Sequence, residues 1–232
     1  MIWNIRKVNN IHYASIRNLD ISNGEGIGVA LFVQGCHFHC YNCFNTETWD
    51  FNGGKEWTPD VKEKFLELID RPYIKRVSIL GGEPLADENL DDVLDLVTEI
   101  NKRYNFQKVD SVNHCKIGVS EDENADEIRL SLPNKSIWLY SGYELSLKKE
   151  YIPVDDFWND EDEEYYRFIT NPKDNNISDF KRSVIISKCD VVIDGRYIDS
   201  QRNPSKKWAG SDNQRIVSIA ESLKQGKVIM LE

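Results

Sequence analysis

The sequence predicts an α/β protein in which parallel strands alternate with helices. Four short apolar runs are rich in β-branched and aromatic residues, which is typical of strands buried on both faces, and they lie at 29–33, 77–80, 137–140 and 191–193. Two stretches with helical periodicity separate the first three runs. This alternation indicates a sheet with right-handed crossovers, and 232 residues suit a single domain, 1–232.

The first helix is expected to begin at Thr58-Pro59, because threonine can cap a helix and proline suits its first turn, and to end at Arg71-Pro72. The second is expected over Asp87–Tyr104, with acidic residues early and basic residues late, as the helix macrodipole favours. We interpret the apolar stripes of both helices as ordinary core packing.

Two stretches break this alternation and are interpreted as insertions into the single domain. The first, about 105–133, has two apolar runs around a polar segment and predicts a β-hairpin with a loose loop. The second, about 153–188, contains seven acidic residues within 155–164, a run that we interpret as a solvated face. Neither stretch predicts a second domain.

Composition and charge narrow the classes of function. The chain is 40% hydrophobic and 29% charged, which is ordinary for a soluble globular protein. Its formal net charge of −10 argues against a nucleic-acid partner bound through a basic face. Because the N-terminus shows no signal peptide and no apolar run could cross a bilayer, we expect a cytoplasmic protein with no membrane partner.

Three of the five cysteines, Cys36, Cys40 and Cys43, lie within eight residues just after the first predicted strand. Clustered thiols in a reducing compartment favour metal binding, and thiolates suit iron–sulfur clusters or zinc. Four cysteines usually close an iron–sulfur cluster, so a set of three leaves one iron open to another ligand. The alternative is a structural zinc site that His37 or His39 completes.

The segments that follow the other predicted strands are also polar. They are Gly81-Gly82-Glu83, Ser141-Gly142-Tyr143 and Asp194-Gly195-Arg196. Because the carboxyl ends of parallel strands meet at one edge of a sheet, these segments and the cysteine loop should converge. The paired glycines permit close backbone approach to a ligand, although alone they would indicate only a turn. The two other cysteines stand apart, and Cys189 is interpreted as a small buried hydrophobe.

Together, the Cys-x3-Cys-x2-Cys loop and the Gly-Gly-Glu turn resemble the radical S-adenosylmethionine (SAM) superfamily. Within it, the chain resembles the family of anaerobic ribonucleoside-triphosphate reductase activating proteins, with motifs in that family's order over nearly the whole chain. These motifs are Gly24-Glu25-Gly26-Ile27-Gly28, Leu31–Cys36, Cys43-Phe44-Asn45, Thr48-Trp49, Trp138–Tyr143, Asp190–Gly195 and Trp208–Gln214. The resemblance implies an α/β fold that is a partial (β/α) barrel of the radical SAM type with two inserted segments.

The resemblance also implies the cofactors and their ligands. A [4Fe-4S] cluster, whose open iron takes the amino and carboxylate groups of SAM, would be bound by Cys36, Cys40 and Cys43. The methionine end of SAM would be held by Gly81, Gly82 and Glu83, and its adenine would meet the backbone around Asn42 and Phe44. The rest of the pocket would be lined by Tyr140, Ser141 and Asp194. No catalytic residue is expected beyond the cluster and SAM.

The implied reaction defines the implied partners. One electron would split the carbon–sulfur bond of SAM into methionine and a 5′-deoxyadenosyl radical, which would take a hydrogen atom from a glycine of the anaerobic ribonucleoside-triphosphate reductase. An electron donor such as a flavodoxin or ferredoxin would also be needed. Three alternatives stay open, namely an activase of the pyruvate formate-lyase type, a deazaguanine synthase and a zinc-stabilised binding module.

Two parts of the sequence are not explained by this resemblance. Asn42 stands where the resembling family often has glycine, and the arrangement of His37 and His39 is unlike that family's usual loop. The Trp208–Gln214 motif matches the family but has no assigned role. Alternatively, it is a capped turn before a helix that starts near Arg215.

Overall fold

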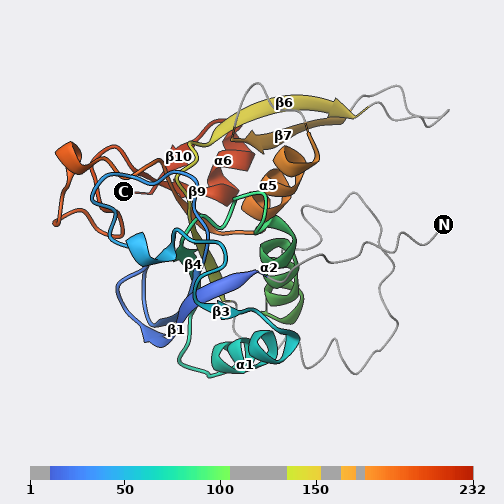
Figure 1. Cartoon of the computed structure of the whole chain (residues 1–232). Helices are drawn as coiled ribbons and strands as arrows, with labels where there is room; N and C mark the ends of the chain where they lie inside the picture. Colours follow the sequence, from blue (N-terminus) through green and yellow to red (C-terminus); the bar gives the residue numbers. More distant parts are fainter. Residues whose placement is uncertain (1–10, 105–134, 153–162, 171–175, 232) are drawn as a thin grey trace, which may run out of the picture.

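The computed structural model describes residues 11–104, 135–152, 163–170 and 176–231, and its main element is an eight-stranded mixed sheet (Figure 1). The strands of this sheet are paired in the order β10-β9-β8-β5-β4-β2-β1-β3. Their bounds are β1 His12–Asp20, β2 Gly28–Val33, β3 Lys55–Glu56, β4 Arg76–Gly81, β5 Ser136–Tyr140, β8 Val191–Asp194, β9 Arg215–Ser218 and β10 Ile229–Met230.

The four predicted strands are confirmed as β2, β4, β5 and β8, which are neighbours in the sheet and run parallel. Val29 pairs with Val77, and Val77 pairs with Ile137, so the apolar runs stand side by side. Antiparallel strands extend the sheet beyond them, β1 and β3 on one side and β9 and β10 on the other. The sequence did not predict these outer strands. The partial barrel that the resemblance implies stays a prediction.

The two predicted helices are confirmed as α1 (Pro59–Ile69) and α2 (Leu90–Tyr104). Thr58 caps α1 because its hydroxyl accepts a hydrogen bond from Val61 N at 3.3 Å. Helix α2 begins three residues after the expected Asp87, since Asn89 is buried in the preceding turn with its side-chain amide bound to two backbone carbonyls. Within the described ranges, none of the helices combines the length and apolar character that crossing a membrane requires.

Part of the stretch 153–188 belongs to the main fold. Helix α5 (Ile177–Ser187) precedes β8 and buries Ile185 and Ile186 in the principal core. Strands β6 (Ser146–Ile152) and β7 (Glu163–Ile169) form a separate antiparallel pair, so the acidic run ends inside a strand. The hairpin predicted at 105–133 and the rest of the acidic run lie outside the described residues.

The expected helix near Arg215 is wrong. Residues 215–218 form strand β9, and helix α6 (Ile219–Gln225) begins only after it. The physical reason is that β-branched Ile216 and Val217 suit a strand, and pairing with β8 places Val217 opposite Val192 in the core. The interpretation of Cys189 as a buried hydrophobe is confirmed, because the residue is 5% exposed and belongs to the principal core.

The two faces of the large sheet have different surroundings. On one face, alternate strand residues such as Leu31, Ile79 and Leu139 form the principal core with the helices, which Figure 1 shows gathered on that side. On the other face, Phe32, Leu80 and Tyr140 form a small separate cluster. This second face is covered by loops rather than helices, and it carries the candidate site.

A buried ion pair fixes the loop between β1 and β2. The wholly buried Arg76 guanidinium binds the Asp20 carboxylate at 2.9 Å and also donates to the Asp20 and Glu25 backbone carbonyls. Burial by itself would raise the pKa of Asp20, but hydrogen bonds from Arg76 and Asn23 outweigh it and hold the pKa below its ordinary value. Arg76 therefore ties this loop to strand β4.

We expect Arg76→Met to lower the free energy of unfolding by about 3–5 kcal/mol, because it leaves the Asp20 carboxylate buried without its cationic partner. Arg103→Met is the matched control, since Arg103 pairs with the partly exposed Glu63 and Glu99 and its replacement should cost less than about 1 kcal/mol. Urea unfolding of both variants measures the difference. A loss at Arg76 no larger than that at Arg103 would contradict the role assigned to the buried pair.

Candidate metal centre

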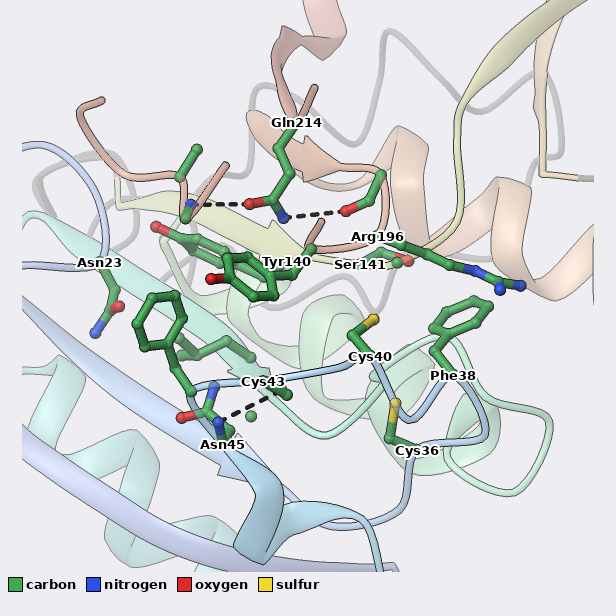
Figure 2. A pocket seen from close by; sticks show the side chains of 18 of the residues that line it. Asn23, Cys36, Phe38, Cys40, Cys43, Asn45, Tyr140, Ser141, Arg196 and Gln214 are labelled. Atoms are coloured by element: carbon green, nitrogen blue, oxygen red, sulfur yellow. Dashed lines mark hydrogen bonds between the residues drawn. The ribbon is translucent and has the colours of Figure 1, made fainter. Parts of the chain in front are cut away.

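A cavity of about 520 Å³ lies on the second face of the large sheet, and this volume is typical of small-molecule sites. Its floor includes Phe32, Leu80 and Tyr140, and its walls come from the segments that follow β2, β4, β5 and β8. Figure 2 shows the cysteine loop on one side of the cavity, with Tyr140 and Gln214 across from it. The predicted convergence of the strand-end segments is therefore confirmed.

The cysteine loop is anchored through its backbone. Cys36 N donates to Trp49 O at 3.1 Å, just after the short helix η1 (Thr46–Thr48). Cys43 N donates to Cys40 O at 3.1 Å, so the last two cysteines share one tight turn. All three cysteines are partly exposed, carry free thiols and line the cavity.

Two residues of this loop have left-handed backbone conformations, His39 with φ 44° and Asn42 with φ 53°. Asparagine tolerates this region better than most residues, which explains Asn42 at a position where glycine would also serve. Its side-chain amide donates to Asp199 Oδ2 at 3.2 Å, and Asn42 does not line the cavity. Asn42 thus shapes the loop through its backbone.

Neither histidine of the loop lines the cavity. His37 Nε2 lies 2.9 Å from Glu88 Oε1 and its ring packs against Phe51, while His39 stacks on Trp49 with ring centroids 4.5 Å apart. Within the described residues, no three His, Cys, Asp or Glu side chains converge on a single metal ion. Cysteines that each hold a different iron of one cluster have no need to converge on one point.

Burial raises the pKa of the Cys36 and Cys40 thiols. The Glu83 carboxylate raises the pKa of Cys36 further, and Cys43 does the same for Cys40, whereas the positive charge of Arg196 lowers the pKa of Cys40. These thiols therefore ionise readily only beside a strong cation, as metal ligands do.

The Gly81–Glu83 turn packs directly against the cysteine loop. Glu83 N donates to Gly35 O at 2.7 Å, and Gly82 N donates to Val33 O at 2.9 Å. A Cβ atom at Gly82 would lie 2.4 Å from the Gly35 oxygen, so the approach requires glycine. The turn and the residue before Cys36 are held in one backbone network.

Glu83 lines the cavity although it is only 2% exposed. Its Oε1 accepts from Ser141 Oγ and Leu85 N, both at 2.9 Å, and its Oε2 accepts from Gly142 N at 2.7 Å. Burial raises the pKa of Glu83 to about 7, against the effect of these hydrogen bonds. Because a carboxylate oxygen has two lone pairs, Oε2 can accept one further donor.

The other site residues that were predicted from the sequence fall into two groups. Phe44, Tyr140 and Ser141 line the cavity with the Gly81–Glu83 turn. Asp194 does not line it, because its wholly buried carboxylate pairs with Arg215 and accepts from Leu145 N at 2.7 Å. In this structure Asp194 cross-links β8 to β9 beside the cavity.

Two arginines belong to the wall formed by residues 195–214, and neither was assigned to the site from the sequence. Arg196 lies 4.3 Å over the Phe38 ring and Arg202 lies 5.4 Å over the Phe44 ring, and both arginines line the cavity. Arg196 comes two residues after β8, in a strand-end segment that the sequence predicted to converge with the cysteine loop. No such signal marked Arg202, which lies farther along the loop.

The residues present fit an iron–sulfur cluster with an open iron. Three soft thiol donors from one loop line a single cavity, and the rest of its volume leaves space for a further small molecule. The turn after β4 adds the Glu83 carboxylate to the same cavity. A structural zinc site, by contrast, needs a fourth ligand that neither loop histidine presents to this cavity.

Three relatives with one name match the chain over nearly its whole length. It is 26% identical over 214 residues to the anaerobic ribonucleoside-triphosphate reductase-activating protein of Enterobacteria phage T4, covering 92% of this chain and 97% of that protein. Proteins of the same name from Vibrio cholerae serotype O1 and Escherichia coli strain K12 are 26% and 27% identical over 208 and 207 residues. These two matches cover 89% and 88% of this chain, and 97% and 96% of the relatives.

The family model of the 4Fe-4S single cluster domain matches residues 22–116 and 122–217. The matched ranges contain the cysteine loop, the Gly81–Glu83 turn and the wall at 195–214, so they include every segment that forms the cavity walls described above. They also cover well over half of the chain. This match, together with the three cysteine thiols that line the cavity, shows that the chain belongs to the 4Fe-4S single cluster domain family.

Proposed function

We propose that the chain is a radical SAM activase that generates a glycyl radical on an anaerobic ribonucleoside-triphosphate reductase. The observation that carries the proposal is the cavity, which brings three cysteines of one loop together with the Gly81–Glu83 turn. The relatives named as activating proteins of that reductase, which match 88–92% of the chain, support the same function.

In this proposal, Cys36, Cys40 and Cys43 hold a [4Fe-4S] cluster and leave one iron for SAM. When bound, the cluster and SAM supply the one-electron chemistry that removes a hydrogen atom from a glycine of the reductase. The protein supplies position: the hydrogen bond from Glu83 N to Gly35 O holds the cysteine loop against the turn that receives the methionine end of SAM.

Glu83 is the group that receives the ammonium of SAM. Its Oε2 has accepting capacity left after its bond to Gly142 N, and it lines the same cavity as the thiols. The other donors to its carboxylate are uncharged, namely Ser141 and the backbone of Leu85, so an incoming cation is electrostatically favourable. Phe44, which lines the same cavity, would meet the adenine.

The exposed aromatic residues of the cysteine loop support a protein substrate. Tyr41 is 77% exposed and Phe44 is 58% exposed, and both flank Cys43. A partner that covers the loop would bury these rings and also keep water from the reaction. We assign this role to the reductase, with electrons from a donor such as a flavodoxin or ferredoxin and with both partners in the cytoplasm.

Anaerobic reconstitution should give about four iron and four sulfide per chain. After addition of SAM, a reductant and a candidate partner, electron paramagnetic resonance should show a glycyl doublet on the ribonucleoside-triphosphate reductase and none on pyruvate formate-lyase. A doublet only on the lyase would identify the other activase, and a chain with one zinc and no iron would be a binding module.

Replacement of one ligand tests the cluster assignment. Cys43→Ala should lose most of the iron and all glycyl radical, because two thiols cannot hold the cluster in its open form. Cys189→Ala is the control, since that cysteine is buried in the principal core away from the cavity lining. Iron analysis and radical yield are the measurements, and equal losses in both variants would refute the assignment.

The pKa of Glu83 predicts a pH dependence for SAM binding. Ionised Glu83 accepts the ammonium and protonated Glu83 does not, so with a pKa of about 7 the affinity should fall as the pH drops below that value. We expect binding roughly tenfold weaker at about pH 6 than at about pH 7.5.

Glu83→Gln should bind SAM weakly at both pH values while it keeps its iron, because it lacks the titrating group. Equilibrium dialysis with labelled SAM measures both proteins. The same pH profile in wild type and variant would show that another group titrates.

A further inference from the structure

The turn formed by residues 208–214 is a part of the cavity that the proposed cofactor contacts do not use. Trp208, Ala209, Gly210 and Gln214 all line the cavity, on the side formed by residues 195–214. SAM is assigned to the cysteine loop and the Gly81–Glu83 turn. The 208–214 turn therefore faces a part of the cavity that these assigned contacts leave free.

Several side chains hold this turn, among them Lys206, whose Nζ donates to the Asp212 and Gln214 carbonyls at 2.7 Å, and Gln214 makes the contacts nearest the cavity lining. Gln214 Oε1 accepts from Gly210 N at 2.8 Å and from Ser211 N at 3.2 Å, and Gln214 Nε2 donates to Gly195 O at 3.0 Å, as Figure 2 shows in part. Both ends of the amide are thus occupied. Gln214 joins the turn to the end of strand β8, and no other side chain in the described residues binds these three backbone groups.

The turn holds a residue in an unfavourable backbone conformation. Trp208 has φ 58°, a region that bulky side chains seldom adopt. Its ring meets the buried Trp138 edge-on, with centroids 4.9 Å apart. Such a conformation persists only where the surroundings determine it, and it is typical of ligand-binding segments.

The turn also supports the cysteine loop. A Cβ atom at Gly210 would lie 3.0 Å from Phe44 Cε2 and 3.1 Å from Tyr197 Cδ2, so the turn backbone is packed closely on both rings. The Phe44 and Tyr197 rings meet edge-on with centroids 5.1 Å apart. A shift of the turn would therefore move Phe44, which is the residue after Cys43.

We propose that Gln214 is a positioning residue: by closing the 208–214 turn it fixes the wall of the cavity that aligns the glycine-bearing segment of the reductase with SAM. This role rests on the proposed function. Hydrogen-atom transfer needs the reacting atoms within about 3–3.5 Å. A small displacement of the wall would therefore allow SAM to be cleaved while less glycyl radical is formed on the reductase.

The test compares glycyl radical formed with SAM cleaved in reconstituted protein mixed with the reductase. In Gln214→Leu the ratio should fall about tenfold or more, with iron content unchanged and the KM for the reductase altered far less. Gln214→Glu keeps the acceptor for Gly210 and Ser211 but loses the donor to Gly195, so its ratio should be intermediate. Gln225→Leu, an exposed change on α6, should match wild type.

Hydrogen–deuterium exchange of the cluster-free protein gives a second readout. The Gly210 and Ser211 amides should exchange roughly fivefold to tenfold faster in Gln214→Leu, because each loses its acceptor. Faster exchange with an unchanged ratio of radical to cleaved SAM would overturn the positioning role and leave a merely structural one. A wild type that cleaves SAM without any radical on the reductase would instead refute the proposed function, and the alignment role with it.

Discussion

The close backbone contact between Gly82 and Gly35 is the constraint on which the rest of the site depends. Strands β2 and β4 are parallel neighbours, so the loops that follow them leave the sheet at the same edge. Only a residue without a side chain lets them touch, because a Cβ at Gly82 would lie 2.4 Å from the Gly35 oxygen. The sheet thus sets where the cysteines are, and the glycine sets how near they come to Glu83.

The buried carboxylates of Asp194 and Glu83 both lie at strand ends but have different partners. The difference distinguishes a carboxylate that stabilises the fold from one that can bind a ligand. Asp194 is neutralised by the guanidinium of Arg215, so it has its cation within the fold. Within the described part of the chain, the Glu83 carboxylate accepts hydrogen bonds only from a hydroxyl and two backbone amides, and burial raises its pKa to about 7. Of these two carboxylates, only that of Glu83 can bind a cationic ligand, because that of Asp194 is already paired with Arg215.

The central strands β2, β4, β5 and β8 could be predicted from the sequence because buried parallel strands are continuous apolar runs, as Val29–Val33 shows. It missed β1, in which the exposed Arg17 and Leu19 obscure the pattern and two register shifts break the alternation. For the site, the positions of the cysteine loop and the Gly81–Glu83 turn after parallel strands were enough to predict that they meet at one edge of the sheet. The place of Arg202 in the cavity wall could not be predicted, because the path of residues 195–214 is fixed by long-range bonds such as that from Gln214 to Gly195.

The outermost strands of the large sheet, β3 and β10, have two residues each. Strands this short offer few unpaired amide and carbonyl groups of their own, but β3 pairs only with His12 and Tyr13 of β1, so the rest of β1 has no neighbour on that side within the described residues. This part of β1 is therefore the stretch of the large sheet at which an extended segment of another chain would find unpaired backbone groups.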